Sequence, residues 1–154
     1  MTFANHLLPA KQRVMESLQE GPIPTVKKVS SKALIAEVAT TAFELIAKYP
    51  TGTTAVITTD RTKVGRHLHD NGWTRGAEDS RVMTNGRISL FILTPEMARG
   101  LEFDGVVVVE PASFPQNLER HGALYTSLTR ANRELAVVYS GALPDALRDS
   151  SRRK

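Results

Sequence analysis

The segment Gly105-Val106-Val107-Val108-Val109-Glu110 is the clearest indication of the fold class. Its four consecutive valines show no alternation of apolar and polar residues, which indicates a strand that is buried on both faces. Strands of this kind occur mainly in parallel sheets whose two faces are covered by helices. We therefore expect an α/β protein with a mostly parallel, doubly wound sheet.

The neighbouring segments predict further strands and helices in alternation. Runs rich in Val, Ile and Thr predict strands over 53–59, 88–93 and 133–139. Apolar residues at helical spacing predict three helices, which run from an N-cap at Ser30-Ser31 to Tyr49-Pro50, from an N-cap at Asp60 to Asn71, and over 115–132. Ligands of such sheets lie at the carboxyl ends of the strands, so we expect a site beside the loops after Thr58, Leu93 and Val109.

The ends of the chain predict shorter elements. They are a helix over 3–18 interrupted at Pro9, the rigid connector Gly21-Pro22-Ile23-Pro24, an edge strand over 25–29 and a helix over 143–148. We expect a helical segment and linker over 1–24, the α/β domain over 25–149 and a basic tail over 150–154. Residues 73–86 are the least regular part, where Trp73 is expected to be a packing anchor.

Composition is that of an ordinary globular protein. The 154 residues are 41% hydrophobic and 23% charged, with a net charge of +4 that permits nucleic-acid partners. No apolar run is long enough to span a bilayer, and the N-terminus does not look like a secretory signal. Cysteine is absent, which excludes disulfides and thiolate metal sites and fits a reducing compartment. We expect a cytoplasmic location and no membrane partner.

Several catalytic motifs are missing from the sequence. It contains no phosphate-binding loop of the G-x-x-x-x-G-K-[ST] type, no G-x-G-x-x-G and no G-x-S-x-G. His67 and His69 are two positions apart on a predicted helix, so they point to different faces, and Glu78-Asp79 follows no apolar strand. We therefore expect no metal site in this chain.

Two stretches carry residues suited to nucleotide chemistry. In Thr94-Pro95-Glu96-Met97-Ala98-Arg99-Gly100-Leu101-Glu102-Phe103-Asp104, a proline ends the strand and a glycine permits a tight bend. In Leu124-Tyr125-Thr126-Ser127-Leu128-Thr129-Arg130-Ala131, Arg130 falls near the end of the predicted helix, where the helix dipole favours a cation. Taken alone, either stretch also fits a structured loop or an arginine that binds backbone carbonyls.

Together the two stretches resemble motifs V and VI of superfamily 1 helicases of the UvrD/Rep/PcrA type, and most closely those of the HelD-like branch. Ala98 to Asp104 followed by valines is similar to motif V, in which Lys usually stands at the place of Arg99. Tyr125-x-x-Leu128-Thr129-Arg130-Ala131 is similar to motif VI, with Ser127 in place of the usual Ala. UvrD-like members commonly have a DNA-contacting His where this chain has Glu96.

The resemblance implies the second, C-terminal RecA-like domain of such an enzyme, a three-layer P-loop NTPase-type fold. Arg130 would be the arginine finger, Glu102 would lie near the ribose, and Gly100 would shape the loop at the nucleotide. ATP and Mg²⁺ would be held mainly by an N-terminal RecA-like domain of the same parent chain. The nucleic acid would be single-stranded DNA, contacted by Thr94 and Arg99. Arg61 and Lys63 are basic residues at another strand end, which could also touch nucleic acid or could form only a solvated first turn of the helix.

Two other functions stay open at this point. HelD-like proteins resemble helicases but use ATP to remodel RNA polymerase, and Glu96 in place of His favours this interpretation. The chain could also be an α/β binding domain that kept the fold and lost catalysis.

Overall fold

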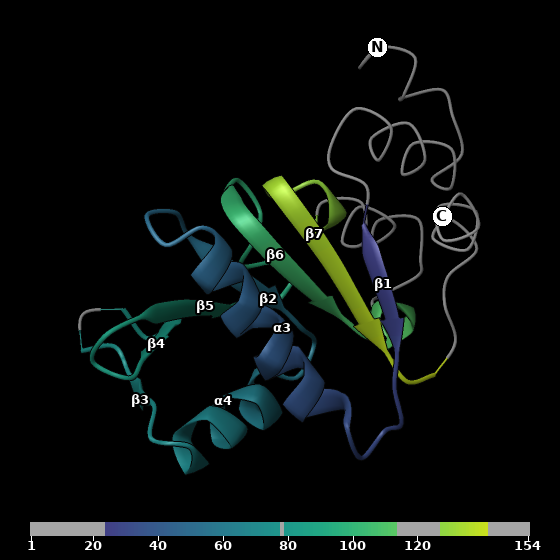
Figure 1. Ribbon diagram of the computed structural model, residues 1–154, viewed down its shortest axis with the longest axis horizontal. Coiled ribbons are helices and arrows are strands. Elements are labelled where there is room, and N and C mark those ends of the chain that lie inside the picture. The colour runs from purple at the N-terminus through teal and green to yellow at the C-terminus, as the bar shows by residue number, and fades with distance from the viewer. Residues whose placement is uncertain (1–23, 78, 114–126, 142–154) are drawn as a thin grey trace.

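The computed structural model describes residues 24–77, 79–113 and 127–141. Figure 1 shows a single sheet with helices packed on it. In chain order the elements are β1 (Thr25–Lys28), α3 (Leu34–Lys48), β2 (Thr54–Ile57), α4 (Arg61–Asp70), β3 (Thr74–Arg75), β4 (Val82–Thr84), β5 (Ser89–Leu93), β6 (Phe103–Val109), the 3-10 turn η1 (Pro111–Ser113) and β7 (Ala131–Tyr139).

In the described part of the chain the sheet has seven strands, in the order β1-β7-β6-β2-β5-β4-β3. The first five of these are parallel to one another, and β4 and β3 are added antiparallel at one edge. The predicted mostly parallel α/β fold is therefore confirmed. The expected edge strand near residues 25–29 is also confirmed, since β1 closes the other edge.

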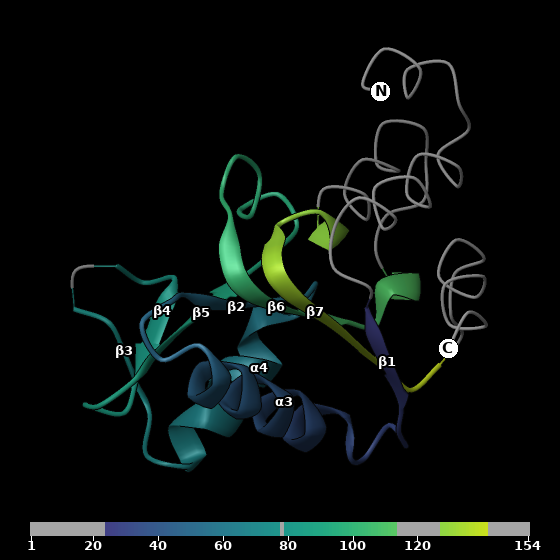
Figure 2. The same ribbon diagram turned by 45° about the horizontal axis from the view of Figure 1, so that its top comes forward.

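The four valines of β6 are buried on both faces of the sheet. Val106 and Val108 belong to one apolar cluster, and Val107 and Val109 belong to the other. Helices α3 and α4 cover the second cluster and lie on the same side of the sheet (Figure 2). The opposite face packs against the segment between β5 and β6, through Met97, Ala98 and Leu101, and against Leu128.

The two helices begin in different ways. Asp60 is the N-cap of α4, as predicted, and its Oδ1 accepts a hydrogen bond of 3.1 Å from the backbone N–H of Lys63. For α3 the predicted cap was wrong, because the N-cap is Ala33, which has no capping side chain. The Ser30 Oγ instead accepts from the Ala33 N–H at 3.2 Å and so stabilises the turn that precedes the helix.

One boundary prediction was also wrong, and one segment without a predicted element contains strands. Strand β7 begins at Ala131, inside the helix predicted over 115–132, because the Arg130 carbonyl already accepts the Phe103 N–H at 2.9 Å in the pairing with β6. Residues 73–86, which showed no pattern, contain β3 and β4. The role predicted for Trp73 is confirmed, since its side chain is 4% exposed and stacks on Phe43 with ring centroids 5.4 Å apart.

The helices predicted over 3–18 and 143–148, most of the helix over 115–132 and the basic tail lie outside the described residues. The domain boundaries at 24 and 149 stay predictions. No helix in the described ranges is both long and apolar enough to cross a membrane.

Candidate functional site at the amino ends of β6 and β7

The segment 94–102 runs from one end of the parallel strands to the other. We call the side of the sheet where these strands end the carboxyl edge, and the side where they begin the amino edge. It leaves the carboxyl end of β5 at Leu93 and enters the amino end of β6 at Phe103, and these strands point the same way because each pairs in parallel with β2. Thr94 therefore lies at the carboxyl edge, whereas Glu102 lies at the amino edge. The loop after Leu93, beside which a site was expected, thus carries Glu102 to the amino edge, where Arg130 also lies.

The first half of this segment is held by local hydrogen bonds and one buried residue. The Thr94 Oγ1 accepts the Met97 N–H at 3.2 Å, and the Thr94 carbonyl accepts the Ala98 N–H at 3.1 Å. Ala98 is fully buried against the sheet. The segment then turns at Gly100, whose φ of +79° lies in the left-handed region that favours glycine. These contacts fix the path of the chain into Leu101 and Glu102.

Arg130 is held against this segment by its side chain and its backbone. Its Nη1 donates to the Leu101 carbonyl at 3.2 Å, and its Nη2 donates to the Thr129 Oγ1 at 3.4 Å. Its own carbonyl accepts the Phe103 N–H. Arg130 follows the helical residues Ser127 and Leu128 after a turn, and its side chain is half-buried. The two motifs, distant in sequence, thus meet at the amino ends of β6 and β7.

Glu102 contributes an exposed carboxylate to the same edge. Its side chain is exposed, and it makes no hydrogen bond or ion pair with the residues in the described ranges. Leu101 and Phe103 anchor it on either side, since Leu101 packs on the core and the buried Phe103 ring lies 5.2 Å from that of Phe91. A fixed guanidinium beside a free carboxylate fits a nucleotide, because phosphate oxygens bind the cation and ribose hydroxyls donate to the anion.

The other predicted site residues lie apart from this pair. Arg61 and Lys63 start α4 at the carboxyl end of β2, the opposite edge of the sheet. The Arg61 guanidinium donates to the carbonyls of Ile92 at 2.7 Å and Ser80 at 3.1 Å, so it braces the strands it faces. Lys63 and Arg99 are both exposed. The structure therefore brings Gly100, Glu102 and Arg130 together and separates Thr94, Arg61 and Lys63 from them.

Within the described ranges, no three His, Asp or Glu side chains are grouped as metal ligands. Asp79 instead pairs with Arg81 at 2.9 Å, and the hydrogen bond from that guanidinium is the main reason that the pKa of Asp79 falls to about 2. The residues at the amino edge thus suit the sugar and phosphates of a nucleotide, and a Mg²⁺ ion would need ligands from elsewhere.

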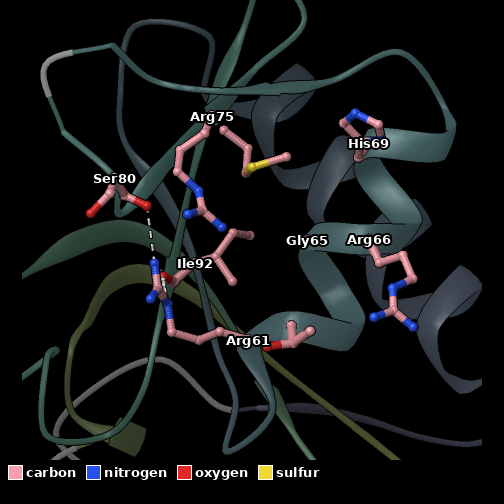
Figure 3. A pocket seen from close by; sticks show the side chains of 9 residues that line it. Arg61, Gly65, Arg66, His69, Arg75, Ser80 and Ile92 are labelled. Carbon is pink, nitrogen blue, oxygen red and sulfur yellow. Dashed lines mark hydrogen bonds between the residues drawn. The ribbon is translucent and has the colours of Figure 1, made fainter.

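Sequence reasoning missed the basic residues that gather beside α4, namely Arg66, His69 and Arg75 (Figure 3). Two local signals point to this region. Arg61, Gly65 and His69 recur every four residues, which places His69 on one helix face with Arg61. Asn85-Gly86 between two short runs of β-type residues indicates the hairpin of β4 and β5, and Gly86 has the expected positive φ of +93°, but Arg75 lies in the preceding strand β3 and no local signal marks it.

Comparison with known proteins supports the resemblance of the motifs. Residues 89–138, which include both motifs, match the profile of the UvrD-like helicase C-terminal domain. The fold is similar to the C-terminal domain of a possible DNA helicase from Lactobacillus plantarum WCFS1, with 22% identity, a TM-score of 0.63, and coverage of 90% of this chain and 88% of that chain.

The fold is also similar to the large terminase of a thermophilic bacteriophage. In its complex with ADP, that protein gives a TM-score of 0.50 at 12% identity, over 85% of this chain and 38% of the terminase. A second crystal form gives 0.51 at 11% identity over the same shares. No curated protein matches the chain in sequence. These likenesses show a RecA-like α/β fold.

Proposed function

We propose that this chain is the C-terminal motor domain of an ATP-dependent DNA helicase or translocase, within which it supplies motifs V and VI to a shared ATP site. The observation that carries the proposal is the hydrogen bond from the Arg130 Nη1 to the Leu101 carbonyl, next to Glu102, whose exposed carboxylate has no partner among the described residues. This contact joins the two motifs at one edge of the sheet. The match of residues 89–138 to the UvrD-like helicase C-terminal domain supports the same function.

Arg130 acts as an arginine finger in this proposal. A guanidinium at the γ-phosphate offsets the negative charge that spreads over the phosphoryl oxygens during transfer. The Leu101 carbonyl accepts from one nitrogen, so the side chain is already oriented before the nucleotide arrives. Glu102 accepts hydrogen bonds from the ribose, and the turn at Gly100 sets its direction.

The remaining parts of the site come from outside the chain. An N-terminal RecA-like domain of the same parent polypeptide supplies the phosphate loop and the ligands of Mg²⁺. Closure of the two domains brings Arg130 to the nucleotide and moves the protein along single-stranded DNA, which Thr94, Arg99, Arg61 and Lys63 contact. We infer a cytoplasmic site of action for such a motor.

ATP hydrolysis by the parent polypeptide, with and without single-stranded DNA, tests the proposal. We expect Arg130→Ala to lower kcat by about 10³-fold or more, because an arginine finger contributes on the order of 10³ to 10⁵. Arg130→Lys retains the charge but not the planar fork, so it should recover only a small part of the rate. The isolated 154-residue chain should hydrolyse ATP negligibly.

Arg133→Ala is the matched control. This arginine is three positions further along, is exposed, and pairs with Asp104 at 3.2 Å, so its loss should leave hydrolysis unchanged. Circular dichroism spectra that coincide for the variants show that folding is intact. Turnover that survives Arg130→Ala, or that Arg133→Ala lowers equally, would overturn the assignment of the finger.

The exposed Glu96 favours a second function, remodelling of RNA polymerase by a HelD-like ATPase. A carboxylate at this place repels the DNA backbone, where a His would bind it. Hydrolysis that depends on Arg130 and that RNA polymerase, but not DNA, stimulates would favour this alternative. Turnover by neither route would favour a binding domain without catalysis.

A further inference from the structure

The pairing of β6 with β7 is irregular close to the amino edge. Phe103 pairs with Ala131 and Gly105 pairs with Glu134, so β7 has one residue more than β6 between these two pairs. An extra residue of this kind forms a β-bulge, which bends a strand and redirects its side chains. Bulges are over-represented next to active sites, and this one directly follows the residues that join the two motifs.

The same position is irregular towards β2, the other neighbour of β6. The backbone N–H groups of Asp104 and Gly105 both donate to the Thr53 carbonyl, at 3.0 and 3.1 Å. Two residues of β6 thus oppose a single residue at the start of β2. Asp104 is therefore the point at which the regular register of three strands is interrupted.

The irregularity changes the face of the sheet to which the side chains point. Phe103 and Ala131 belong to the apolar cluster on the face opposite α3. In the next pair, a Cβ at Gly105 would meet Leu45 of α3, and Glu134 accepts hydrogen bonds at the end of the same helix. Residues two apart on a regular strand share one face, so the amino edge of β6 is turned over relative to the body of the sheet.

The Asp104 carboxylate holds this arrangement together. Its Oδ2 accepts the Thr53 N–H at 2.8 Å, and its Oδ1 accepts from the Arg133 Nε at 3.2 Å. The second contact is an ion pair whose arginine side chain is 63% exposed, so it contributes little. Gly52 leaves the room that the first contact needs, because a Cβ there would collide with the Asp104 carboxylate.

Two contacts that fix Arg130 come from residues just before the bulge. The Leu101 carbonyl accepts from the Arg130 guanidinium, and the Phe103 N–H donates to the Arg130 carbonyl. The path of the backbone through Asp104 therefore sets the position of the side chain and of the main chain of Arg130.

We propose that Asp104 is a positioning residue, which holds the bulge and thereby directs the Arg130 guanidinium towards the nucleotide. The inference rests on the proposed function of Arg130. A displacement of about 1 Å can cost a factor on the order of 10² in rate. Loss of the contact with Thr53 should therefore lower kcat, although the carboxylate itself faces the start of β2.

ATP hydrolysis by the parent polypeptide tests the proposal. We expect Asp104→Ala to lower kcat about 10- to 100-fold. Asp104→Asn retains an oxygen that can accept the Thr53 N–H, so it should recover most of the rate. Gly52→Ala should lower kcat as Asp104→Ala does, because its Cβ displaces the carboxylate. Arg133→Ala removes the other partner of Asp104 and is the matched control, which should leave kcat unchanged.

The Arg130→Ala background separates positioning from a general loss of structure. If Asp104 acts through Arg130, Asp104→Ala should lower kcat no further in a chain that already lacks the guanidinium. Urea unfolding shows that each variant is folded in the assay, and Gly52→Ala carries the same comparison if Asp104→Ala is unfolded.

An equal loss in both backgrounds, or an Asp104→Asn variant no more active than Asp104→Ala, would overturn the proposal. If Arg130→Ala lowers kcat while Asp104→Ala does not, this inference alone fails and the proposed function stands. If Arg130→Ala leaves kcat unchanged, the finger and its positioning by Asp104 fail together.

Discussion

At the scale of single residues, Arg130 depends on the strands around it for its position. Its carbonyl takes part in the pairing of β6 with β7, and its guanidinium donates to the carbonyl of Leu101. The backbone and the side chain of Arg130 are therefore both tied to the segment that carries Glu102. A cation held in this way loses little conformational entropy when it meets a phosphate.

Glu102 should affect nucleotide binding without affecting stability. Loss of a hydrogen bond to a charged group costs about 1.5–3 kcal/mol, so Glu102→Ala should raise the KM for ATP of the parent polypeptide roughly 10- to 100-fold. The exposed side chain has no partner in the described part of the chain, so the melting temperature should not change. Glu96→Ala, on the same segment, is the control. An unchanged KM for Glu102→Ala would contradict a role at the ribose.

Gly100 and Gly65 should respond in opposite ways to alanine. Neither position has an atom within 4 Å of a new Cβ, so steric contact does not distinguish them. Gly100 has a φ of +79°, where alanine is strained by about 1–2 kcal/mol, whereas Gly65 is helical and alanine should stabilise it by up to about 1 kcal/mol. Urea unfolding of both variants measures the difference. A stabilised Gly100→Ala would show that the turn does not need the left-handed conformation.

At the scale of elements, α4 both packs on the sheet and forms one wall of a groove. Its buried residues Val64 and Leu68 attach it to the sheet, and Arg61, Gly65 and His69 on the adjoining face of the helix form one wall of the groove. The antiparallel strands β3 and β4 supply the other wall through Arg75 and Met83. The antiparallel strands β3 and β4, which extend the parallel sheet, therefore form the second wall of a groove whose first wall is an exposed face of α4.

The N-cap of α4 should make a measurable contribution to stability. Asp60→Ala removes the acceptor of the Lys63 N–H, which should lower the free energy of unfolding by about 1 kcal/mol. Asp70→Ala is the control at the other end of the helix, where a carboxylate opposes the helix dipole, so its loss should be neutral or slightly stabilising. Equal destabilisation by both substitutions in urea unfolding would argue against the cap.

At the scale of the whole molecule, charged groups connect the strands at both edges of the sheet. At the carboxyl edge, the Glu110 carboxylate accepts from the Ser140 N–H at 2.7 Å and the Ser140 Oγ at 2.6 Å, which joins the ends of β6 and β7. At the other edge, Glu134 of β7 accepts from Lys48 at 2.6 Å and from the Tyr49 hydroxyl at 3.0 Å, at the end of α3.

These carboxylates should make the protein less stable in acid. The hydrogen bond from Lys48 lowers the pKa of Glu134. Burial raises the pKa of Glu110, but the hydrogen bonds from Ser140 outweigh it, so the net shift is downward. A carboxyl whose pKa is lower in the folded state contributes stability above its unfolded value of 4.5, and that contribution is lost as pH falls through the folded value.

The free energy of unfolding, measured in urea, should therefore fall as pH decreases from about 5 to about 2. Glu110→Gln cannot titrate, so its dependence on pH should be weaker than that of the wild type. Identical slopes for wild type and Glu110→Gln would show that Glu110 contributes nothing to acid sensitivity.

Local patterns in the sequence were enough to predict the fold class and most of the strand and helix positions in the described ranges. The run Val106 to Val109 indicated a strand buried on both faces, and Asp60 indicated the start of a helix, because both signals depend only on neighbouring residues. The strands β3 and β4 were missed because each is three residues or fewer, too short for an alternating pattern to show.

Only the folded chain shows where the motif residues meet. Arg130 contacts Leu101 at the amino ends of β6 and β7, and Arg75 faces Arg61 across a groove, because the order and register of the strands bring these residues together. Such contacts join residues far apart in the chain, and no local spacing encodes them. The sequence therefore predicted candidate site residues, and the pairing of strands determined which of them lie side by side.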